Sequence, residues 1–297
     1  MLLNHLNCAF LGPKGTFSEI AAISYFGNDN NFYPQKTITE VFEVVENNKN
    51  FYGIVPIENS IEGSVSTVMD LLFEISDVVI VGECIVPIRH FLLSNETLSL
   101  EKVKVLYSHQ QAINQCNKFI KKNLKSVEII FTASTTNACE IISNIPNSAA
   151  IASKRAIQLY NLKVLASDIQ DSNNNYTRFL VIKNKNNEVT FVKDLENEVN
   201  RYKTSIICAP KYNKAGVLCD ILEIFKRENI NLTRIESRPT KKQLGEYLFY
   251  IDLEGYIHNP KIECALKDIK NICSFFKFLG SYPLKREMNS TEEVIKN

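Results

Sequence analysis

Two short strings of the chain contain the residue types needed to bind an oxygen-rich anion and move a proton. The first, residues 53–65, reads Gly-Ile-Val-Pro-Ile-Glu-Asn-Ser-Ile-Glu-Gly-Ser-Val, and the second, residues 175–181, reads Asn-Tyr-Thr-Arg-Phe-Leu-Val. Each joins a short apolar strand to hydroxyl, amide or charged groups that a packed core does not need. Such groups donate and accept hydrogen bonds. The strings therefore predict a small-anion site that uses no thiol, metal cage or cofactor loop.

The elements around these strings alternate between strands and helices. Apolar runs predict strands at 8–11, 53–56, 78–81, 104–107 and 149–152, and helical spacing predicts helices at 19–26, 39–45, 65–73, 111–121, 137–143 and 154–159. This alternation favours a mainly parallel sheet, whose ligands bind in a crevice at the carboxyl ends of the strands. Both polar strings lie at the end of a predicted strand or in the adjoining loop.

A second unit follows a polar stretch at 183–187, which is rich in Lys and Asn and predicts a domain boundary. Beyond it, the pattern predicts strands at 203–209, 232–238, 246–253 and 274–282 and helices at 217–225 and 260–272. The order is βαββαβ, which is the ferredoxin-like plan.

Composition excludes several classes of partner. The 297 residues are 45% hydrophobic, and 34 Lys and Arg balance 33 Asp and Glu, so no strong field favours nucleic acid or an anionic membrane. No apolar run approaches the roughly 20 residues that span a bilayer. Eight cysteines stand singly among aliphatic residues, and four histidines lack ligand spacing. We expect a cytoplasmic protein with reduced thiols and no metal, cofactor, nucleic-acid or membrane partner.

Several motifs occur in the order found in one enzyme family. They are the run 12–18, Val55-Pro56-Ile57-Glu58-Asn59-Ser60, Tyr107-Ser108-His109, Ile169-Gln170-Asp171, Asn175 and Thr177-Arg178-Phe179. Further along come Ile235-Glu236-Ser237-Arg238-Pro239, Leu244-Gly245-Glu246-Tyr247 and Gly280-Ser281-Tyr282-Pro283. From about Cys8 to Pro283 the chain resembles prephenate dehydratase with its C-terminal ACT regulatory domain.

The resemblance implies an α/β fold with a two-lobed, periplasmic-binding-protein-like catalytic domain over 1–185. Its second lobe is expected at about 79–160, and the active-site cleft lies between the lobes. A ferredoxin-like ACT domain is expected over 200–283 and a polar tail over 284–297. No chorismate mutase helix precedes Cys8, so the resemblance is to the monofunctional enzyme.

The implied reaction is the cofactor-free decarboxylating dehydration of prephenate to phenylpyruvate, carbon dioxide and water, a step towards L-phenylalanine. Thr177 takes the family's catalytic position and would donate a proton or strong hydrogen bond to the departing hydroxyl. Arg178 is the expected counter-charge for a substrate carboxylate. A structural ion pair that orients the Thr177 loop is its alternative role.

The remaining substrate-binding positions carry mostly neutral donors. Asn59, Ser60, Ser108 and Gln115 are expected to bind prephenate through their amides and hydroxyls. Glu58 is expected to orient Asn59 and water in the pocket, with helix capping as the alternative. Phe179 is expected to wall the substrate ring, although an aromatic at this place is as often core.

The ACT motifs imply allosteric feedback inhibition by L-phenylalanine in a homodimer or homotetramer. The expected effector-binding residues are Gly216, Val217, Leu218, Glu236, Ser237, Arg238 and Pro239. The chain departs from the family at Ala215 and Val217, where proline and alanine are usual, and at Gln110, where proline is usual. These differences leave the strength of inhibition open.

Two alternatives to prephenate dehydratase remain open from the sequence. One is an arogenate dehydratase, because arogenate differs from prephenate by an amine in place of a ketone. The other is a non-enzymatic amino-acid-sensing protein, since two-lobed α/β units and ACT domains also serve as receptors.

Overall fold

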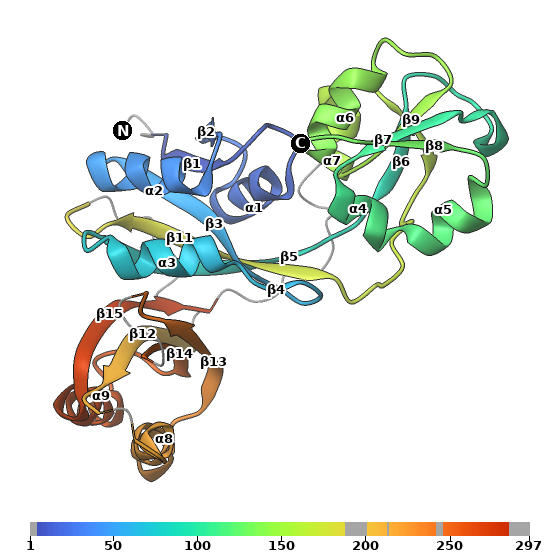
Figure 1. Ribbon diagram of the computed structural model, residues 1–297. Coiled ribbons are helices and arrows are strands. Elements are labelled where there is room, and N and C mark those ends of the chain that lie inside the picture. The colour runs from blue at the N-terminus through green and yellow to red at the C-terminus, as the bar shows by residue number, and fades with distance from the viewer. Residues whose placement is uncertain (1–4, 188–200, 213, 242–245, 285–297) are drawn as a thin grey trace.

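The computed structural model describes residues 5–187, 201–212, 214–241 and 246–284. Two α/β lobes occupy the first part of the chain, and a third unit lies below the first lobe (Figure 1). The polar tail expected at 284–297 falls outside these residues from 285 onward, as do Leu244 and Gly245 of one ACT motif.

The first lobe is a mixed sheet with helices on it. Its strands lie in the order β2 (Asn31–Gln35), β1 (Asn7–Leu11), β3 (Phe51–Asn59), β11 (Tyr176–Asn184) and β5 (Val78–Pro87), with β4 (Gly63–Ser64) beside β3. Its helices are α1 (Phe17–Phe26), α2 (Ile38–Asn47) and α3 (Ser66–Glu74). The hydroxyls of Thr16 and Thr37 accept from backbone N–H groups in the first turns of α1 and α2, which fixes where these helices begin.

The expectation of a mainly parallel sheet is wrong for this lobe. β1 runs parallel to β2 and β3, but β11 runs antiparallel to both of its neighbours, β3 and β5. The chain leaves the lobe after β5 and returns as β11, so these two neighbouring strands pair antiparallel. The expected start of the second lobe near residue 79 is also wrong, because Val78–Pro87 is a strand of the first sheet.

The second lobe is a smaller sheet in the order β10 (Lys163–Ala166), β6 (Phe91–Ser94), β9 (Ser148–Ala152), β7 (Val105–Ser108) and β8 (Glu128–Phe131). Around it lie η1 (Leu100–Lys102), α4 (Gln110–Gln115), α5 (Asn117–Asn123), α6 (Thr135–Ile142) and α7 (Lys154–Leu159). The helix predicted at 111–121 is divided between α4 and α5, with Cys116 at the junction. The sequence pattern did not predict strands β2 and β8, because they are largely exposed and lack an apolar alternation.

The third unit has the predicted βαββαβ order. Its elements are β12 (Tyr202–Pro210), α8 (Val217–Arg227), β13 (Leu232–Pro239), β14 (Tyr247–Glu254), α9 (Pro260–Ile272) and β15 (Cys273–Pro283). The sheet order is β13-β14-β12-β15. The expected mixed α/β architecture with a ferredoxin-like C-terminal unit is confirmed.

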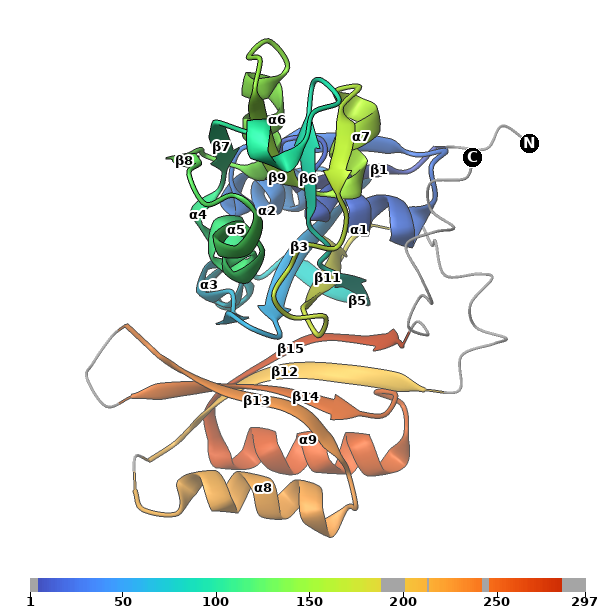
Figure 2. The ribbon, with the colours of Figure 1, turned by 90° about the vertical axis from the view of Figure 1, so that its right-hand side faces the viewer.

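The sheet of the third unit buries both of its faces. One face packs on α8 and α9 through residues such as Ile206, Ile251 and Ile269. The opposite face contributes Tyr250 and Leu279 to a core that also contains first-lobe residues. Figure 2 shows this sheet between the first lobe and the two helices. The two units therefore share one apolar core, which ties the position of the sheet to the strands of the first lobe.

Candidate active site

The two polar strings of the sequence meet where β3 ends and β11 begins. Asn59 and Thr177 are paired across these antiparallel strands. The Asn59 Nδ2 group donates to Thr177 Oγ1 at 2.9 Å and to Asn175 Oδ1 at 2.9 Å. Asn59 Oδ1 accepts from the backbone N–H groups of Ile61 and Glu62 at 2.9 and 3.0 Å. Because backbone N–H groups can only donate, they fix the Asn59 amide with its N–H donors towards Thr177.

The direction of the Asn59 bond determines what Thr177 can do. Thr177 Oγ1 is the acceptor in this bond, and Thr177 is 9% exposed. Within the described residues its hydroxyl hydrogen has no protein acceptor. A hydroxyl that accepts one bond keeps its hydrogen for a second partner, so Thr177 can donate to a bound molecule.

The second lobe reaches this cluster through Gln115 at the end of α4. Gln115 Oε1 accepts from Asn175 Nδ2 at 2.9 Å and lies 3.0 Å from His90 Nε2. Gln115 Nε2 donates towards Glu62 Oε1 at 3.4 Å. A continuous set of amides therefore connects the two lobes across the strand that carries Thr177.

Ser60 and Ser108 have structural partners in this arrangement. Ser60 Oγ donates to Asn174 O at 2.8 Å and accepts from Tyr176 N at 2.9 Å, which holds the loop that leads into Thr177. Ser108 is fully buried and donates to Ile151 O at 2.7 Å. Its expected contact with substrate is not compatible with this placement, because its hydroxyl hydrogen is already used inside the second lobe.

Arg178 and Glu58 lie on the opposite face of the sheet from Thr177 and Asn59. Neighbouring side chains on a strand point to opposite faces, so the residue that follows Thr177 faces the third unit. Arg178 donates from Nε to Glu83 at 2.7 Å and from Nη1 to Asp252 at 2.6 Å. Glu58 lies 3.7 Å from Arg234 Nε. This geometry does not agree with the expected roles of Arg178 as a substrate counter-charge and of Glu58 as an orienter of Asn59. For Arg178, the alternative role in a structural ion pair is the one observed.

Phe179 is a core residue. It is 2% exposed and packs with Phe10, Tyr52 and Ile54 in the first lobe. The expectation that it walls the substrate ring is therefore wrong, and the alternative core role is the one observed.

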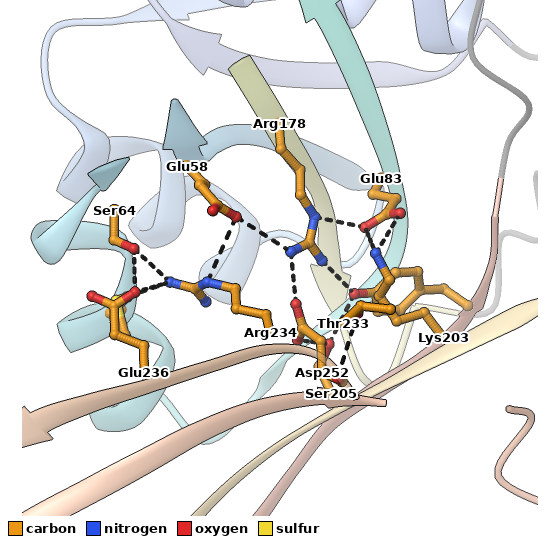
Figure 3. A network of polar contacts seen from close by, with 12 residues as sticks. Glu58, Ser64, Glu83, Arg178, Lys203, Ser205, Thr233, Arg234, Glu236 and Asp252 are labelled. Carbon is orange, nitrogen blue, oxygen red and sulfur yellow. Dashed lines mark hydrogen bonds and ion pairs between the residues drawn. The ribbon is translucent and has the colours of Figure 1, made fainter. Parts of the chain in front are cut away.

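The charges around Arg178 form a network between the first lobe and the third unit (Figure 3). Lys203 Nζ donates to both carboxylate oxygens of Glu83 at 2.8 and 3.0 Å. Ser205 donates to Asp252 at 2.6 Å, and Arg178 Nη2 donates to Tyr282 OH at 3.1 Å. Burial alone would raise the pKa of Asp252, but Arg178, Ser205 and Arg234 outweigh it and lower that pKa. Asp252 is therefore a buried carboxylate whose charge depends on its cationic partners.

Helix α3 is held by side chains of the third unit along its length. Arg238 Nη2 donates to Asp70 Oδ1 at 3.1 Å, and Tyr250 OH donates to Met69 O at 2.8 Å. Lys277 Nζ donates to Leu72 O and Ile75 O, both at 2.6 Å, at the end of the helix. A cation at a helix C-terminus satisfies carbonyls that have no intrahelical partner. The third unit thus positions α3, which follows the loop that carries Glu62.

The expected effector residues divide into two groups. Gly216 caps α8 with φ of 83°, which favours glycine, and Val217 lines a groove of about 350 Å³ together with Phe73 and Phe275. Leu218 packs against the core beneath α8. On β13 the side chains alternate, so Ser237 and Pro239 are exposed.

Glu236 and Arg238 point to the catalytic unit. Glu236 accepts from Arg234 Nη2 at 2.6 Å and from the Ser64 hydroxyl, while Arg238 binds Asp70 of α3. Their expected role as direct phenylalanine ligands does not agree with these ion pairs inside one chain.

Sequence reasoning missed three residues of the cluster, which are His90, Glu62 and Asn175. Asn175 is one of the family motifs. Because it lies two residues before Thr177, its side chain is expected on the same face, and this spacing could have identified it as a site residue. His90 stands between Arg89 and Phe91, and no local pattern separates it from a core histidine.

Two further properties concern the whole described chain. None of its helices in the described ranges is long and apolar enough to cross a membrane. The described residues contain no group of three or more potential metal ligands.

These features define a two-lobed α/β protein with a polar site at the lobe junction and a C-terminal ACT domain. A family profile of the ACT domain matches residues 211–271, and a profile of prephenate dehydratase matches residues 8–187. The chain belongs to the prephenate dehydratase family, whose members are lyases, and the expected resemblance is confirmed.

Individual relatives support this assignment. The chain is 44% identical to a bifunctional chorismate mutase/prephenate dehydratase of Aquifex aeolicus, over 94% of this chain and 74% of that protein. It is 42% identical to a prephenate dehydratase of Methanocaldococcus jannaschii, over 92% of this chain and 96% of that protein. The crystal structure of prephenate dehydratase from Arthrobacter aurescens in complex with L-Phe is 30% identical, has a TM-score of 0.82, and is matched over 93% of this chain and 89% of that one.

Proposed function

We propose that this chain converts prephenate to phenylpyruvate, carbon dioxide and water, with Thr177 as the group that assists departure of the hydroxyl. The carboxylate leaves as carbon dioxide, and the electrons of its carbon–carbon bond enter the ring. The carbon–oxygen bond at the opposite ring carbon breaks with its electron pair going to oxygen. The departing oxygen, hydrogen-bonded by Thr177, takes up one proton that solvent ultimately supplies and leaves as water. The ring becomes aromatic, which supplies the driving force, so the main demand on the protein is to assist a poor leaving group.

One observation carries this proposal, which is the hydrogen bond from Asn59 to Thr177 Oγ1 at 2.9 Å. It leaves the Thr177 hydrogen free and turns it away from Asn59. Gln115 presents a neutral N–H donor to the same junction. Neutral donors suit a reaction that discharges a carboxylate, because strong stabilisation of the charged carboxylate in the ground state would be lost as it leaves and would raise the barrier.

We propose that L-phenylalanine inhibits the enzyme through the ACT domain, in a homodimer or homotetramer. The relative from Arthrobacter aurescens was crystallised with L-Phe, and a groove lies beside Val217 in this chain. Strand β13 leads from that end of the domain to α3 through Arg238 and to β4 through Glu236. Phenylalanine would act by binding the less active arrangement better, and it can shift the balance only by that difference in affinity.

The decisive experiment offers the purified protein prephenate and arogenate separately and follows phenylpyruvate and phenylalanine, with and without added L-phenylalanine. We expect turnover of prephenate and its suppression by the effector. Turnover of arogenate alone would instead identify an arogenate dehydratase. Phenylalanine binding without turnover of either substrate would identify a sensing protein.

The proposal places the enzyme in the cytoplasm. Its eight cysteines are all free thiols, and six of them are buried. Unpaired thiols are typical of a reducing compartment.

A further inference from the structure

His90 lies beneath the polar cluster at the junction of the lobes, one residue before β6. Its side chain is buried, its backbone N–H donates to Gln170 Oε1 at 2.9 Å, and its ring meets the edge of Phe17 at a centroid distance of 5.7 Å. Its Nε2 atom lies 3.0 Å from Gln115 Oε1. His90 therefore contacts the cluster but lies behind the groups that face a substrate.

The proton positions in the cluster follow from groups that can only donate. The backbone N–H groups of Ile61 and Glu62 both point at one Asn59 atom, which must be the oxygen. Asn59 Nδ2 then faces Asn175 at 2.9 Å, so the facing Asn175 atom is its oxygen. The other end of the Asn175 amide is a donor.

The same reasoning gives the orientation of the Gln115 amide and the position of the hydrogen on the His90 ring. The Gln115 atom 2.9 Å from Asn175 Nδ2 must be Oε1, and the same oxygen faces His90. His90 Nε2 therefore carries a hydrogen and donates it. Two donors saturate Gln115 Oε1, and its Nε2 group is left pointing towards the loop that carries Glu62.

The other ring nitrogen of His90 supports a neutral imidazole. Nδ1 is buried and has no hydrogen-bond partner among the described residues. A proton on Nδ1 would place an unpaired N–H and a charge in a buried position. Burial lowers the pKa of His90, against a smaller opposing effect of the Gln115 hydrogen bond.

We infer that His90 is a positioning residue for the dehydration, which acts by locking the orientation of the Gln115 amide. The neutral ring keeps Gln115 Oε1 turned towards His90 and Asn175 and the Gln115 N–H donors turned towards Glu62. It thereby completes the set of amides that ends at Thr177. This inference rests on the proposed function of the Thr177 site, and it assigns His90 no contact with substrate.

A double-mutant cycle tests the inference with prephenate turnover by the full chain. We expect His90→Leu to lower kcat/KM about tenfold, the scale of one lost hydrogen bond. In a Gln115→Leu background the same change should alter kcat/KM less than about twofold, because His90 acts through Gln115. His90→Gln keeps a donor near the position of Nε2 and should recover most of the lost activity. Equal losses in both backgrounds would reduce His90 to a packing residue and overturn the inference.

Leu92→Val is the matched control for stability. Leu92 is buried two residues away on β6 and belongs to the core of the second lobe. The shortened side chain should lower the melting temperature while leaving kcat/KM within about twofold of the wild type. A loss in this variant as large as that in His90→Leu would attribute the effect to stability and contradict the inference.

A second measurement does not depend on turnover. The ¹⁵N spectrum of the histidine rings, with His90 assigned by its absence in His90→Gln, should show a protonated Nε2 and a bare Nδ1 at neutral pH. The opposite tautomer or an imidazolium would overturn the inference. Failure of the wild type to consume prephenate would instead refute the proposed function.

Discussion

Asp252 offers the sharpest test of how the ACT domain is joined to the catalytic unit, through the substitution Asp252→Asn. Its carboxylate is buried, accepts from Arg178 at 2.6 Å and accepts from Ser205 at 2.6 Å. Asparagine has nearly the same shape and keeps a hydrogen-bonding oxygen. The substitution therefore removes the charge and turns one of the two accepting oxygens into an N–H donor that faces a donor of Arg178 or Ser205.

The expected loss follows from the charges that remain. Arg178 lies at direct hydrogen-bond distance from the carboxylates of both Glu83 and Asp252, and Lys203 lies at that distance from Glu83. Removing one partner of a buried ion pair costs about 3 to 5 kcal/mol, and Glu83 still pairs with Arg178. We therefore expect the low end of the range, about 3 kcal/mol. For a chain of this size that loss lowers the melting temperature by about 6 to 12 °C.

The assay is thermal unfolding of the full chain followed by circular dichroism, with Asp77→Asn as the matched control. Asp77 also pairs with a lysine, Lys185, at 2.6 Å, but both side chains are more than 40% exposed. Exposed pairs contribute little, so the control should melt close to the wild type. A melting temperature of Asp252→Asn within 2 °C of the wild type would refute the reasoning that this ion pair holds the two units together.

The pH dependence has a definite sign. The folded-state pKa of Asp252 is lowered, because Arg178, Ser205 and Arg234 outweigh the effect of burial. Its ionisation therefore stabilises the fold above the unfolded pKa of about 3.9 and loses that contribution as the pH falls towards the folded value. The stability difference between wild type and Asp252→Asn should stay constant from about pH 8 to 5 and shrink below about pH 4. A difference that grew on acidification would contradict this sign.

Three further substitutions test the site and its control. Thr177→Ala should lower kcat at least about 10²-fold without unfolding the chain, while Thr177→Ser, which keeps the hydroxyl, should retain much more turnover. Equal kcat in the wild type and the alanine variant would show that Thr177 takes no part in the chemistry. Asn59→Asp replaces the donor that faces Thr177 Oγ1 with an acceptor that binds the threonine hydrogen, so steady-state kinetics should show kcat reduced at least about tenfold. An unchanged kcat would argue against the assigned direction of the Asn59–Thr177 hydrogen bond. Lys277→Met removes the donor to the last carbonyls of α3. It should weaken inhibition by L-phenylalanine, while kcat without effector stays within about threefold of the wild-type value. Unchanged inhibition would exclude α3 as the link between the units.

Several features of this protein were predictable because their signals are local. The helical spacing of Val217, Ile221 and Phe225 identified α8, and strand alternation identified the βαββαβ order. Asn59 and Thr177 were also identified from their motifs, and the structure brings their side chains into direct contact. Motif order supplied the family, which the comparisons confirm.

Other features depended on contacts between distant parts of the chain. Local sequence indicated that β5 and β11 are strands but not that they pair antiparallel in one sheet. Likewise, the pattern placed Thr177 and Arg178 on opposite faces of a strand without indicating which face meets the ACT domain. Arg178 was therefore assigned to the substrate, whereas its partners Glu83 and Asp252 lie 95 and 74 residues away.

The amino-acid sequence by itself determined the element types, the ACT plan and the Asn59 and Thr177 pair, because periodicity and motif spacing are properties of short segments. Only the tertiary structure decided that the ACT sheet shares a core with the first lobe, that Glu58 and Arg178 lie at that interface, and that His90 contacts Gln115. Each of these depends on which strand faces which neighbour. That choice is made by burial of apolar surface and pairing of charge across the whole fold, and no single segment encodes it.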